Sequence, residues 1–468
     1  MHEKYKIKSI TGWLKSRSDN RNIFVGMVWV AGFVLIAKLA AAAKEMAVAW
    51  RYGISDIVDA YLFVLNLVSW PVAVWTSVLT VVLIPLAARI REQSPQSLPR
   101  FRAELLGLAI LMGVFLVALS QFGLPMLLKS NWVGLPAHTA TIAAGMAPLL
   151  SWLTIIGVLV GLYSTWTMSD GRHANTLFEG IPAIGILTGV LLFSGIEPLL
   201  WGAIGGALAQ LVCLVVPFST KRELESPVWT FSSSYWIPFR RGFGVMLTGQ
   251  LLMSLTGIID QFFAAHLATG AISTLGYANR ILSLVVSLGA TAVTRATLPV
   301  FSNARARSPG PEQALAPALP WANLLFIIGV LGAVAGWCMA PLMVRTLFER
   351  GQFTAADADS TSAVLRFGMA QLPFYFCSLV FASAHSSRGH YKALLLSGML
   401  GLSVKLLVNA LLMKNLSINA LMLSSAAMYF SNMILLFGLW RLTKGSPNKT
   451  NLETSRPGGD WHHLFGIW

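Results

Sequence analysis

Three cations lie inside apolar segments of this chain, where a charged side chain is costly. Lys38, Lys44 and Arg280 each fall in a run of mostly hydrophobic residues. An isolated charge at the centre of a hydrocarbon layer costs roughly 2.5–3.5 kcal/mol on insertion scales, so charges kept there usually have a function. Arginine can bind a phosphate through two hydrogen bonds, and lysine acts as a point charge beside it. These residue types, with Arg295 as a further member, predict a cationic cavity that binds a phosphate-bearing headgroup.

Ionisable residues in the same apolar segments allow other interpretations. Lys38 and Glu45 are two helical turns apart and can form an internal ion pair on one helix face. Arg295 can extend to the membrane interface, and Asp59 can cap the free amides at the start of its helix. Asp59 or Asp260 could instead bind a coupling ion. Further candidates are Glu179, Arg366 and Lys405.

The chain has none of the short motifs that indicate catalysis or metal binding. Its sequence contains no P-loop, no histidine and cysteine spacing typical of metal sites and no nucleophile elbow. Cys213, Cys338 and Cys377 lie in apolar runs and are interpreted as small buried hydrophobic residues. We therefore expect neither an enzyme nor a metal or organic cofactor.

The segments that carry these charges are typical of a membrane protein. Of 468 residues, 55% are hydrophobic and 11% are charged, whereas soluble domains have about 25% charged residues. Stretches of about 20 apolar residues are long enough to cross a bilayer. We predict an all-α polytopic membrane protein with about twelve transmembrane helices. They are placed at roughly 25–50, 57–88, 103–128, 138–168, 175–195, 198–218, 237–267, 272–302, 319–348, 358–385, 391–413 and 416–441.

Basic residues concentrate in every second connection between the predicted spans. Examples are Arg89, Arg100, Arg172, Lys221 and Arg305. Basic loops face the cytoplasm, so we expect a multi-pass protein of the bacterial inner membrane with both termini in the cytoplasm. The net charge of +15 then reflects loops beside anionic headgroups rather than nucleic-acid binding.

A polar interruption at residues 221–236 divides the predicted spans into two sets of six. It is rich in serine and charge and is interpreted as a cytoplasmic linker between an N-terminal lobe at 25–220 and a C-terminal lobe at 237–443. Residues 1–24 and 444–468 are expected to form a basic cytoplasmic segment and a cytoplasmic tail.

The two halves show a weak internal repeat. The second predicted span of each half follows a similar string, Gly53-Ile54-Ser55 in the first and Gly270-Ala271-Ile272-Ser273 in the second. An even number of spans per half keeps both repeats in the same orientation. Two such lobes around a central cavity are a common transporter architecture.

Several strings resemble the MurJ/MviN family of lipid II flippases and occur in the family's order. They are Lys38 to Glu45, Asp59-Ala60-Tyr61, Tyr277-Ala278-Asn279-Arg280 and, most specific, Phe348-Glu349-Arg350-Gly351-Gln352-Phe353-Thr354. The resemblance implies a member of the MOP exporter superfamily that flips an undecaprenyl-pyrophosphate-linked saccharide to the outer leaflet. It also implies a set of cavity residues, namely Lys38, Lys44, Asp59, Ser273 and Arg280.

The chain departs from the family pattern at several positions. Asn279 and Ser283 stand where the family has acidic residues, and twelve spans are expected where the family usually has fourteen. These differences leave both lipid II and an O-antigen or exopolysaccharide repeat unit open as the substrate. A cation-coupled multidrug antiporter of the same superfamily is a further alternative, which the excess of basic residues disfavours.

We expect transport by alternating access between the two lobes. Either the membrane potential, worth about 2.3 kcal/mol per charge per 100 mV, or a gradient of Na⁺ or H⁺ could drive it. Two other classes of protein remain as alternatives, a membrane scaffold and a membrane glycosyltransferase. A scaffold would not need the cations in apolar segments. A membrane glycosyltransferase would need catalytic carboxylates beside a large extracytoplasmic loop, and the sequence predicts only short connections there.

Overall fold

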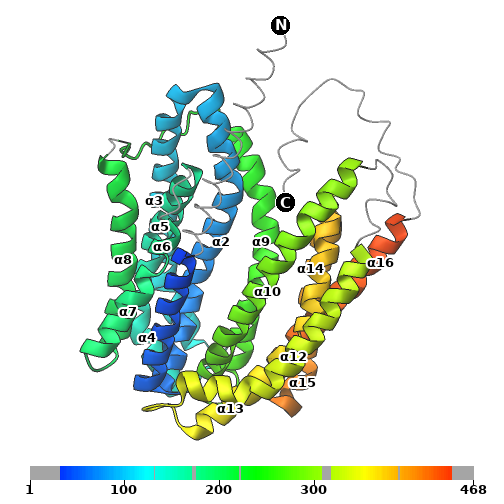
Figure 1. Ribbon diagram of the computed structural model, residues 1–468. Coiled ribbons are helices and arrows are strands. Elements are labelled where there is room, and N and C mark those ends of the chain that lie inside the picture. Colours follow the sequence, from blue (N-terminus) through cyan, green and yellow to red (C-terminus); the bar gives the residue numbers. More distant parts are fainter. Residues whose placement is uncertain are drawn as a thin grey trace, which may run out of the picture. The chain divides into compact units, whose positions relative to one another are not determined.

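The computed structural model describes residues 32–130, 132–170, 175–220, 223–307, 318–387 and 390–444. Every regular element in these ranges is helical (Figure 1). A helix over 32–52 is followed by α2 (Asp56–Gln93), η1 (Pro95–Ser97), α3 (Leu98–Lys129), α4 (Ala137–Leu150), α5 (Trp152–Ser169), α6 (Asn175–Phe178), α7 (Ile181–Leu192), α8 (Glu197–Thr220), α9 (Trp236–Ala265), α10 (Ala271–Arg307), α12 (Ala318–Phe348), α13 (Ala355–Met369), α14 (Leu372–Ser387), α15 (Tyr391–Leu416) and α16 (Asn419–Lys444). The predicted all-α class is confirmed.

Ten helical segments of the described chain are long and apolar enough to cross a membrane. The sequence predicts about twelve spans, and two of these account for the difference. The span at 25–50 lies partly outside the described residues, and the span at 175–195 contains α7, which has only 12 residues. The predicted span at 138–168 is divided between α4 and α5, where Pro148 cannot donate a helical hydrogen bond.

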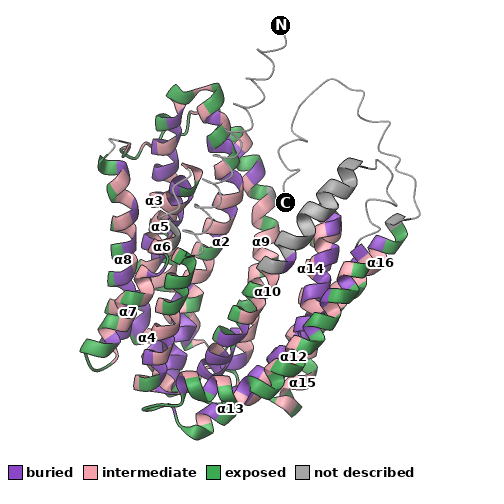
Figure 2. Ribbon diagram, viewed as in Figure 1, coloured by how far each residue is buried: buried purple, intermediate pink, exposed green. Residues whose placement is uncertain are grey.

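Large apolar side chains face outward from the helices. Phe122 is 80% exposed, Met126 78% and Leu288 74%. Figure 2 shows exposed and intermediate residues along α12, and only 11% of the most apolar window of α12 is buried inside the protein. Apolar surface of this extent is unfavourable in water, at about 25 cal/mol per Å². It is compatible with lipid, as a membrane-spanning chain requires.

The chain forms two compact units that are not continuous in sequence. The first holds the described residues up to Val48, Pro71–Phe122 and Pro148–Phe243, and the second holds Ala49–Trp70, Gly123–Ala147 and the chain from Gly244 onward. Residues 49–70 therefore pack with the second half of the sequence. The division into lobes at 25–220 and 237–443 is a different one, and it stays a prediction.

In the first unit, α7 and α8 approach each other through glycines. An added Cβ on Gly185 would lie 2.7 Å from the Cα of Gly206, and one on Gly202 would lie 2.8 Å from the Cα of Ile186. Small residues four apart allow helix backbones to come this close in a membrane. The short α7 is thereby held along α8.

In the second unit, α12 packs against α13 and α14, and α16 packs against both α14 and α15 (Figure 1).

The predicted repeat between the two halves of the sequence has a structural counterpart. Gly53 and Gly270, with φ of +57° and +88°, precede the two longest helices in the described part of the chain, α2 with 38 residues and α10 with 37. A positive φ favours glycine, which explains why this residue marks the same position in both halves.

Candidate functional site

Asp59 caps the start of a helix that lies more than 200 residues away in sequence. Its side chain is in the first turn of α2, and the residue is 3% exposed. One carboxylate oxygen accepts the Gly270 N–H at 2.6 Å, and the other accepts the Ser273 N–H at 2.7 Å. The first amides of a helix have no partner within it and carry partial positive charge. The hypothesis that Asp59 caps its own helix is therefore wrong, because its carboxylate binds the N-terminus of α10.

Ser273 belongs to the same junction. Its side chain is fully buried, and its hydroxyl donates to the Gly270 carbonyl at 3.1 Å. The structure thus brings together two of the predicted site residues, Asp59 and Ser273. In this arrangement both are engaged with protein groups, and a direct role for either in substrate binding stays a prediction.

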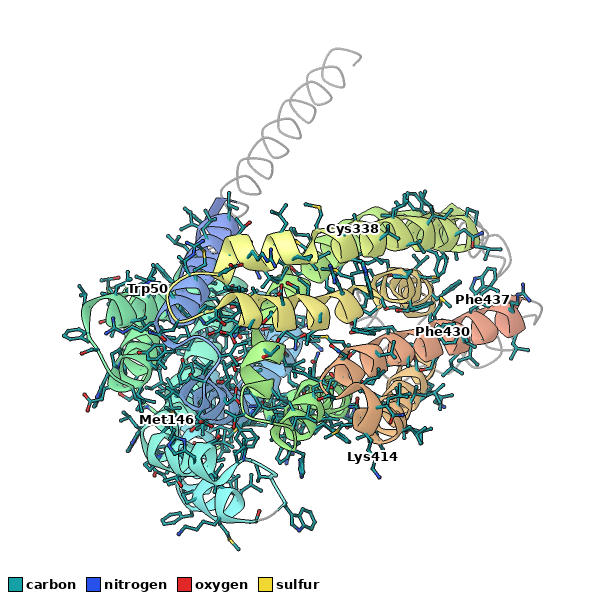
Figure 3. The ribbon with its side chains drawn as sticks, turned by 90° about the horizontal axis from the view of Figure 1, so that it is seen from below. Trp50, Met146, Cys338, Lys414, Phe430 and Phe437 are labelled. Atoms are coloured by element: carbon teal, nitrogen blue, oxygen red, sulfur yellow. The ribbon has the colours of Figure 1, made fainter. Side chains whose placement is uncertain are left out.

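Further hydrogen bonds attach residues 49–70 to the second half of the sequence. They run from Gln352 N–H to the Trp50 carbonyl (2.8 Å), from Tyr277 Oη to the Gly53 carbonyl (3.1 Å), from Gln261 Nε2 to the Leu62 carbonyl (3.0 Å) and from Trp70 Nε1 to Ser254 Oγ (2.9 Å). Figure 3 labels Trp50 at the end of the helix over 32–52, beside the loop that precedes α13. We call these four bonds and the two to Asp59 the closing contacts.

The string Phe348 to Thr354, singled out in the sequence, builds part of this region. Phe348 and Phe353 pack around Tyr277, with ring centroids 5.1 and 5.3 Å from the tyrosine ring. Gly351 has φ +62°, and an added Cβ would lie 2.3 Å from the Trp50 carbonyl oxygen. Thr354 forms a capping box at the start of α13. The motif therefore serves a structural purpose, which is to dock the loop on the end of the helix over 32–52.

The cations of the helix over 32–52 have acidic neighbours. Lys44 Nζ lies 2.6 Å from Glu45 Oε1, so the ion pair involves Lys44 and not Lys38 as hypothesised. Lys38 is exposed, and its charge acts on Glu179, next to Gly180, which closely approaches Ala37. Lys44 is therefore available to an anionic ligand only in competition with Glu45.

The predicted cations of the second half lie on α10. Arg280 is exposed, and Arg295 lies on the same helix, although its side chain is outside the described residues. Arg280 belongs to the second unit, whereas Lys38 and Lys44 belong to the first. Their convergence on one cavity therefore stays a prediction.

Asp260 is engaged by an internal cation. Lys405 Nζ lies 2.9 Å from Asp260 Oδ2, and Lys405 is 1% exposed. The sequence singles out both residues but does not pair them, because they are on α9 and α15. The sequence signal for this pairing was the presence of two opposite charges in separate apolar segments, since a buried charge needs a partner.

Glu104 is a buried carboxylate that the sequence interpretation missed. It is fully buried in α3 and accepts the Ser232 and Ser233 N–H groups at 3.0 and 3.1 Å and the Trp236 Nε1–H at 2.6 Å. These donors lead into α9, so residues 232–236 of the predicted linker are fixed to α3. An acidic residue at the start of an apolar segment, with a serine run far along the chain, was the only sequence signal.

The chain matches the model of a protein family described as lipid II flippase MurJ over residues 58–454. A probable lipid II flippase MurJ from Bdellovibrio bacteriovorus is 27% identical over 284 residues, which cover 57% of this chain and 53% of that protein. Its counterpart from Vibrio cholerae is 25% identical over 272 residues, covering 56% of this chain and 49% of that protein. The chain thus spans about half the length of these relatives.

Solved structures with the same fold include transporters of two kinds. A structure of lipid II flippase MurJ in an inward closed conformation matches with a TM-score of 0.75 at 18% identity, over 89% of this chain and 90% of that one. An inward-facing multidrug resistance MATE transporter of the MOP superfamily matches with a TM-score of 0.70 at 15% identity, over 87% and 94%. At these identities the likeness shows the fold alone.

Proposed function

The chain belongs to the lipid II flippase MurJ family, and from this premise we propose that it moves an undecaprenyl-pyrophosphate-linked saccharide across the bacterial inner membrane. Lipid II is the substrate that the family favours. An O-antigen or exopolysaccharide repeat unit is the alternative, because the chain departs from the family pattern at Asn279 and Ser283. The protein acts as a transporter without catalysis, and both termini face the cytoplasm.

The observation that carries the proposal is the junction between Asp59 and the N-terminus of α10. The closing contacts are hydrogen bonds between the first half and the second half, most of them to backbone groups. With cytoplasmic termini, residues 49–59 lie on the extracytoplasmic side. The closing contacts then act as an extracytoplasmic gate that forms and breaks during alternating access.

The strength of the closing contacts suits a reversible gate. A hydrogen bond to a charged group contributes about 1.5–3 kcal/mol and a neutral one about 1 kcal/mol, so the six bonds together contribute several kcal/mol. A ligand moves a two-state equilibrium from 1:99 to 99:1 when it binds one state more tightly by about 5.5 kcal/mol. A pyrophosphate held by Lys38, Lys44 and Arg280 can supply a difference of that size through charge-assisted hydrogen bonds.

The driving force is either the membrane potential or a gradient of Na⁺ or H⁺. A headgroup with negative charge is favoured in the outward direction by a potential that is negative inside, at about 2.3 kcal/mol per charge per 100 mV. This energy is available without any bound coupling ion. The saccharide headgroup would travel through the protein while the polyprenyl chain stays in lipid.

The experiment that tests the proposal is complementation of a strain depleted of its own lipid II flippase. Wild type should restore growth, and Arg280→Ala and Lys44→Ala should abolish the rescue at equal membrane levels. Lys414→Ala removes an exposed cation at the end of α15 (Figure 3) and is the matched control, which should still rescue.

Failure of well-expressed wild type to rescue would refute lipid II as the substrate. Surface polysaccharide in a strain lacking its repeat-unit flippase would then test the alternative glycan. Rescue by wild type and by both cavity variants would refute the cationic binding mechanism while leaving the substrate intact. Drug export without either rescue would favour the multidrug antiporter.

A further inference from the structure

A buried ion pair connects three membrane helices of the second unit. Asp260 on α9 and Lys405 on α15 meet at 2.9 Å, and their side chains are 16% and 2% exposed. Lys405 Nζ also donates to Ser425 Oγ on α16 at 2.5 Å. Figure 3 shows α15 and α16 in this unit, where Lys414 marks the end of α15 and Phe430 lies on α16. The lysine thus ties a carboxylate of one helix to a hydroxyl of another.

Buried polar atoms that do not reach full hydrogen-bond geometry lie beside the ion pair. Asn409 lies one turn beyond Lys405, beside the Asp260 carboxylate, and is fully buried. Neither polar atom of its amide reaches hydrogen-bond geometry with a described residue, and neither does Asp260 Oδ1. An unpaired buried polar group costs about 1–3 kcal/mol. The site therefore contains more oxygen ligands than the single ammonium group satisfies.

Carboxylate, amide and hydroxyl oxygens are the ligands that hard cations prefer in proteins. Here the cation is the ammonium of Lys405, a compact point charge on a flexible stem. We propose that Asp260, Asn409 and Ser425 form a monovalent-cation site whose cation is supplied by the protein itself, as the side chain of Lys405. Asp260 then binds no free coupling ion. The tethered cation is inferred from the structure alone. Its consequence, that transport does not depend on Na⁺ bound at this site, rests on the proposed function.

The proposal makes a specific prediction for the site without its lysine. Lys405→Ala leaves the Asp260 carboxylate unpaired and opens space for a free cation beside the three oxygen ligands. A ligand that binds only the folded state stabilises it in proportion to its concentration over Kd. The variant should therefore be unstable in choline chloride and should regain stability, saturably, in NaCl.

The experiment measures the thermal unfolding midpoint of full-length protein in detergent, in NaCl and in choline chloride at equal ionic strength. Wild type should unfold at the same temperature in both salts. Lys405→Ala should unfold several degrees lower in choline and recover in Na⁺. Asp260→Asn combined with Lys405→Ala should lose the difference between salts, because the carboxylate that attracts the cation is gone.

Two results would overturn the proposal. One is a saturable stabilisation of wild type by Na⁺ that Asp260→Asn abolishes, which would mean that a free ion binds beside Lys405. The other is a folded Lys405→Ala protein with equal midpoints in both salts, which would make the pair a purely structural bridge. If Lys405→Ala does not fold in either salt, Lys405→Gln is measured in its place by the same criteria.

A matched control and a separate readout complete the design. Lys405→Arg keeps the tethered charge and should remain insensitive to the choice of salt. None of these measurements requires transport, so a failure of the complementation assay with a positive unfolding result would refute the proposed function and leave the tethered cation intact.

Discussion

Two buried carboxylates, Asp59 and Glu104, hold the start of a helix from the second half against a helix from the first half, but they do so with different numbers of donors. Asp59 accepts two backbone N–H groups at the start of α10. Glu104 accepts two backbone N–H groups and an indole N–H ahead of and within α9. It is also bonded by the hydroxyls of Thr230 and Ser232 and lies 3.4 Å from Arg100.

The difference indicates which junction can open. A hydrogen bond to a charged group contributes about 1.5–3 kcal/mol, so the Glu104 junction, which has more of these bonds, costs more to break than the Asp59 junction. At the Asp59 junction, the Gly270 and Ser273 amides must find water or another acceptor when the gate opens. We therefore interpret Glu104 as a permanent anchor of the linker and Asp59 as the centre of a gate that opens.

The largest effect is expected from Glu104→Ala. The substitution leaves the buried Trp236 indole N–H and the partly buried Ser232 and Ser233 amides without their acceptor. It should lower the free energy of unfolding by about 3–5 kcal/mol, the range for breaking one side of a buried charged pair. The measurement is the thermal unfolding midpoint together with the yield of folded protein. Glu92→Ala, at an exposed position on α2, is the control and should unfold like wild type. A midpoint for Glu104→Ala close to that of Glu92→Ala would contradict the anchor.

Asp59→Ala should shift the equilibrium between the closed and the open gate more than it lowers the free energy of unfolding. Loss of two hydrogen bonds to a carboxylate shifts the closed state by about 3 kcal/mol, which is roughly 100-fold in population. The reporter is maleimide labelling of a cysteine at Thr274, which is 6% exposed in wild type, in a chain whose native cysteines are replaced. Labelling should accelerate strongly in Asp59→Ala and stay slow in Asp359→Ala, the control at an exposed aspartate. Equal labelling of the two variants would exclude Asp59 as a gate residue.

Gly53→Ala tests the gate from its other side. Gly53 has φ +57°, and an added Cβ would lie 2.4 Å from the Gln352 carbonyl oxygen. The left-handed conformation costs an alanine about 1–2 kcal/mol, and the contact displaces the loop before α13. Gly195→Ala is the matched control, because φ is +96° there and nothing lies within 4 Å of an added Cβ. The thermal midpoint should fall further for Gly53→Ala, and equal shifts would show that the loop contact is unimportant.

The smallest effect is expected from Tyr277→Phe. The variant loses the hydroxyl bond to the Gly53 carbonyl but keeps the ring packed against Phe348 and Phe353. Loss of one neutral hydrogen bond should cost about 1 kcal/mol and raise labelling at position 274 by about fivefold. A change as large as that of Asp59→Ala would mean that the tyrosine, rather than the carboxylate, dominates the gate.

Part of the site could be predicted from the sequence because charges in apolar segments stand out. Asp59, Asp260 and Lys405 stand out in this way, Ser273 follows from the family resemblance, and each of the four lies in a junction between helices. The pairings were not predictable, since Lys405 and Asp260 lie on different helices and Lys38 was paired with Glu45 in place of Lys44. Spacing along one helix predicts which residues share a face of that helix. The partner of a residue on another helix depends on how the two helices pack.

The sequence alone determined that this protein is a helical membrane bundle of the lipid II flippase MurJ family, because apolar length and local motifs are properties of short segments. Only the tertiary structure decided that Asp59 binds the amides of α10, that Lys405 neutralises Asp260 and that Glu104 fixes the linker. The physical reason is the same in each case. A buried carboxylate must find donors or a cation, but the chain offers many, and helix packing selects which of them comes within hydrogen-bond distance.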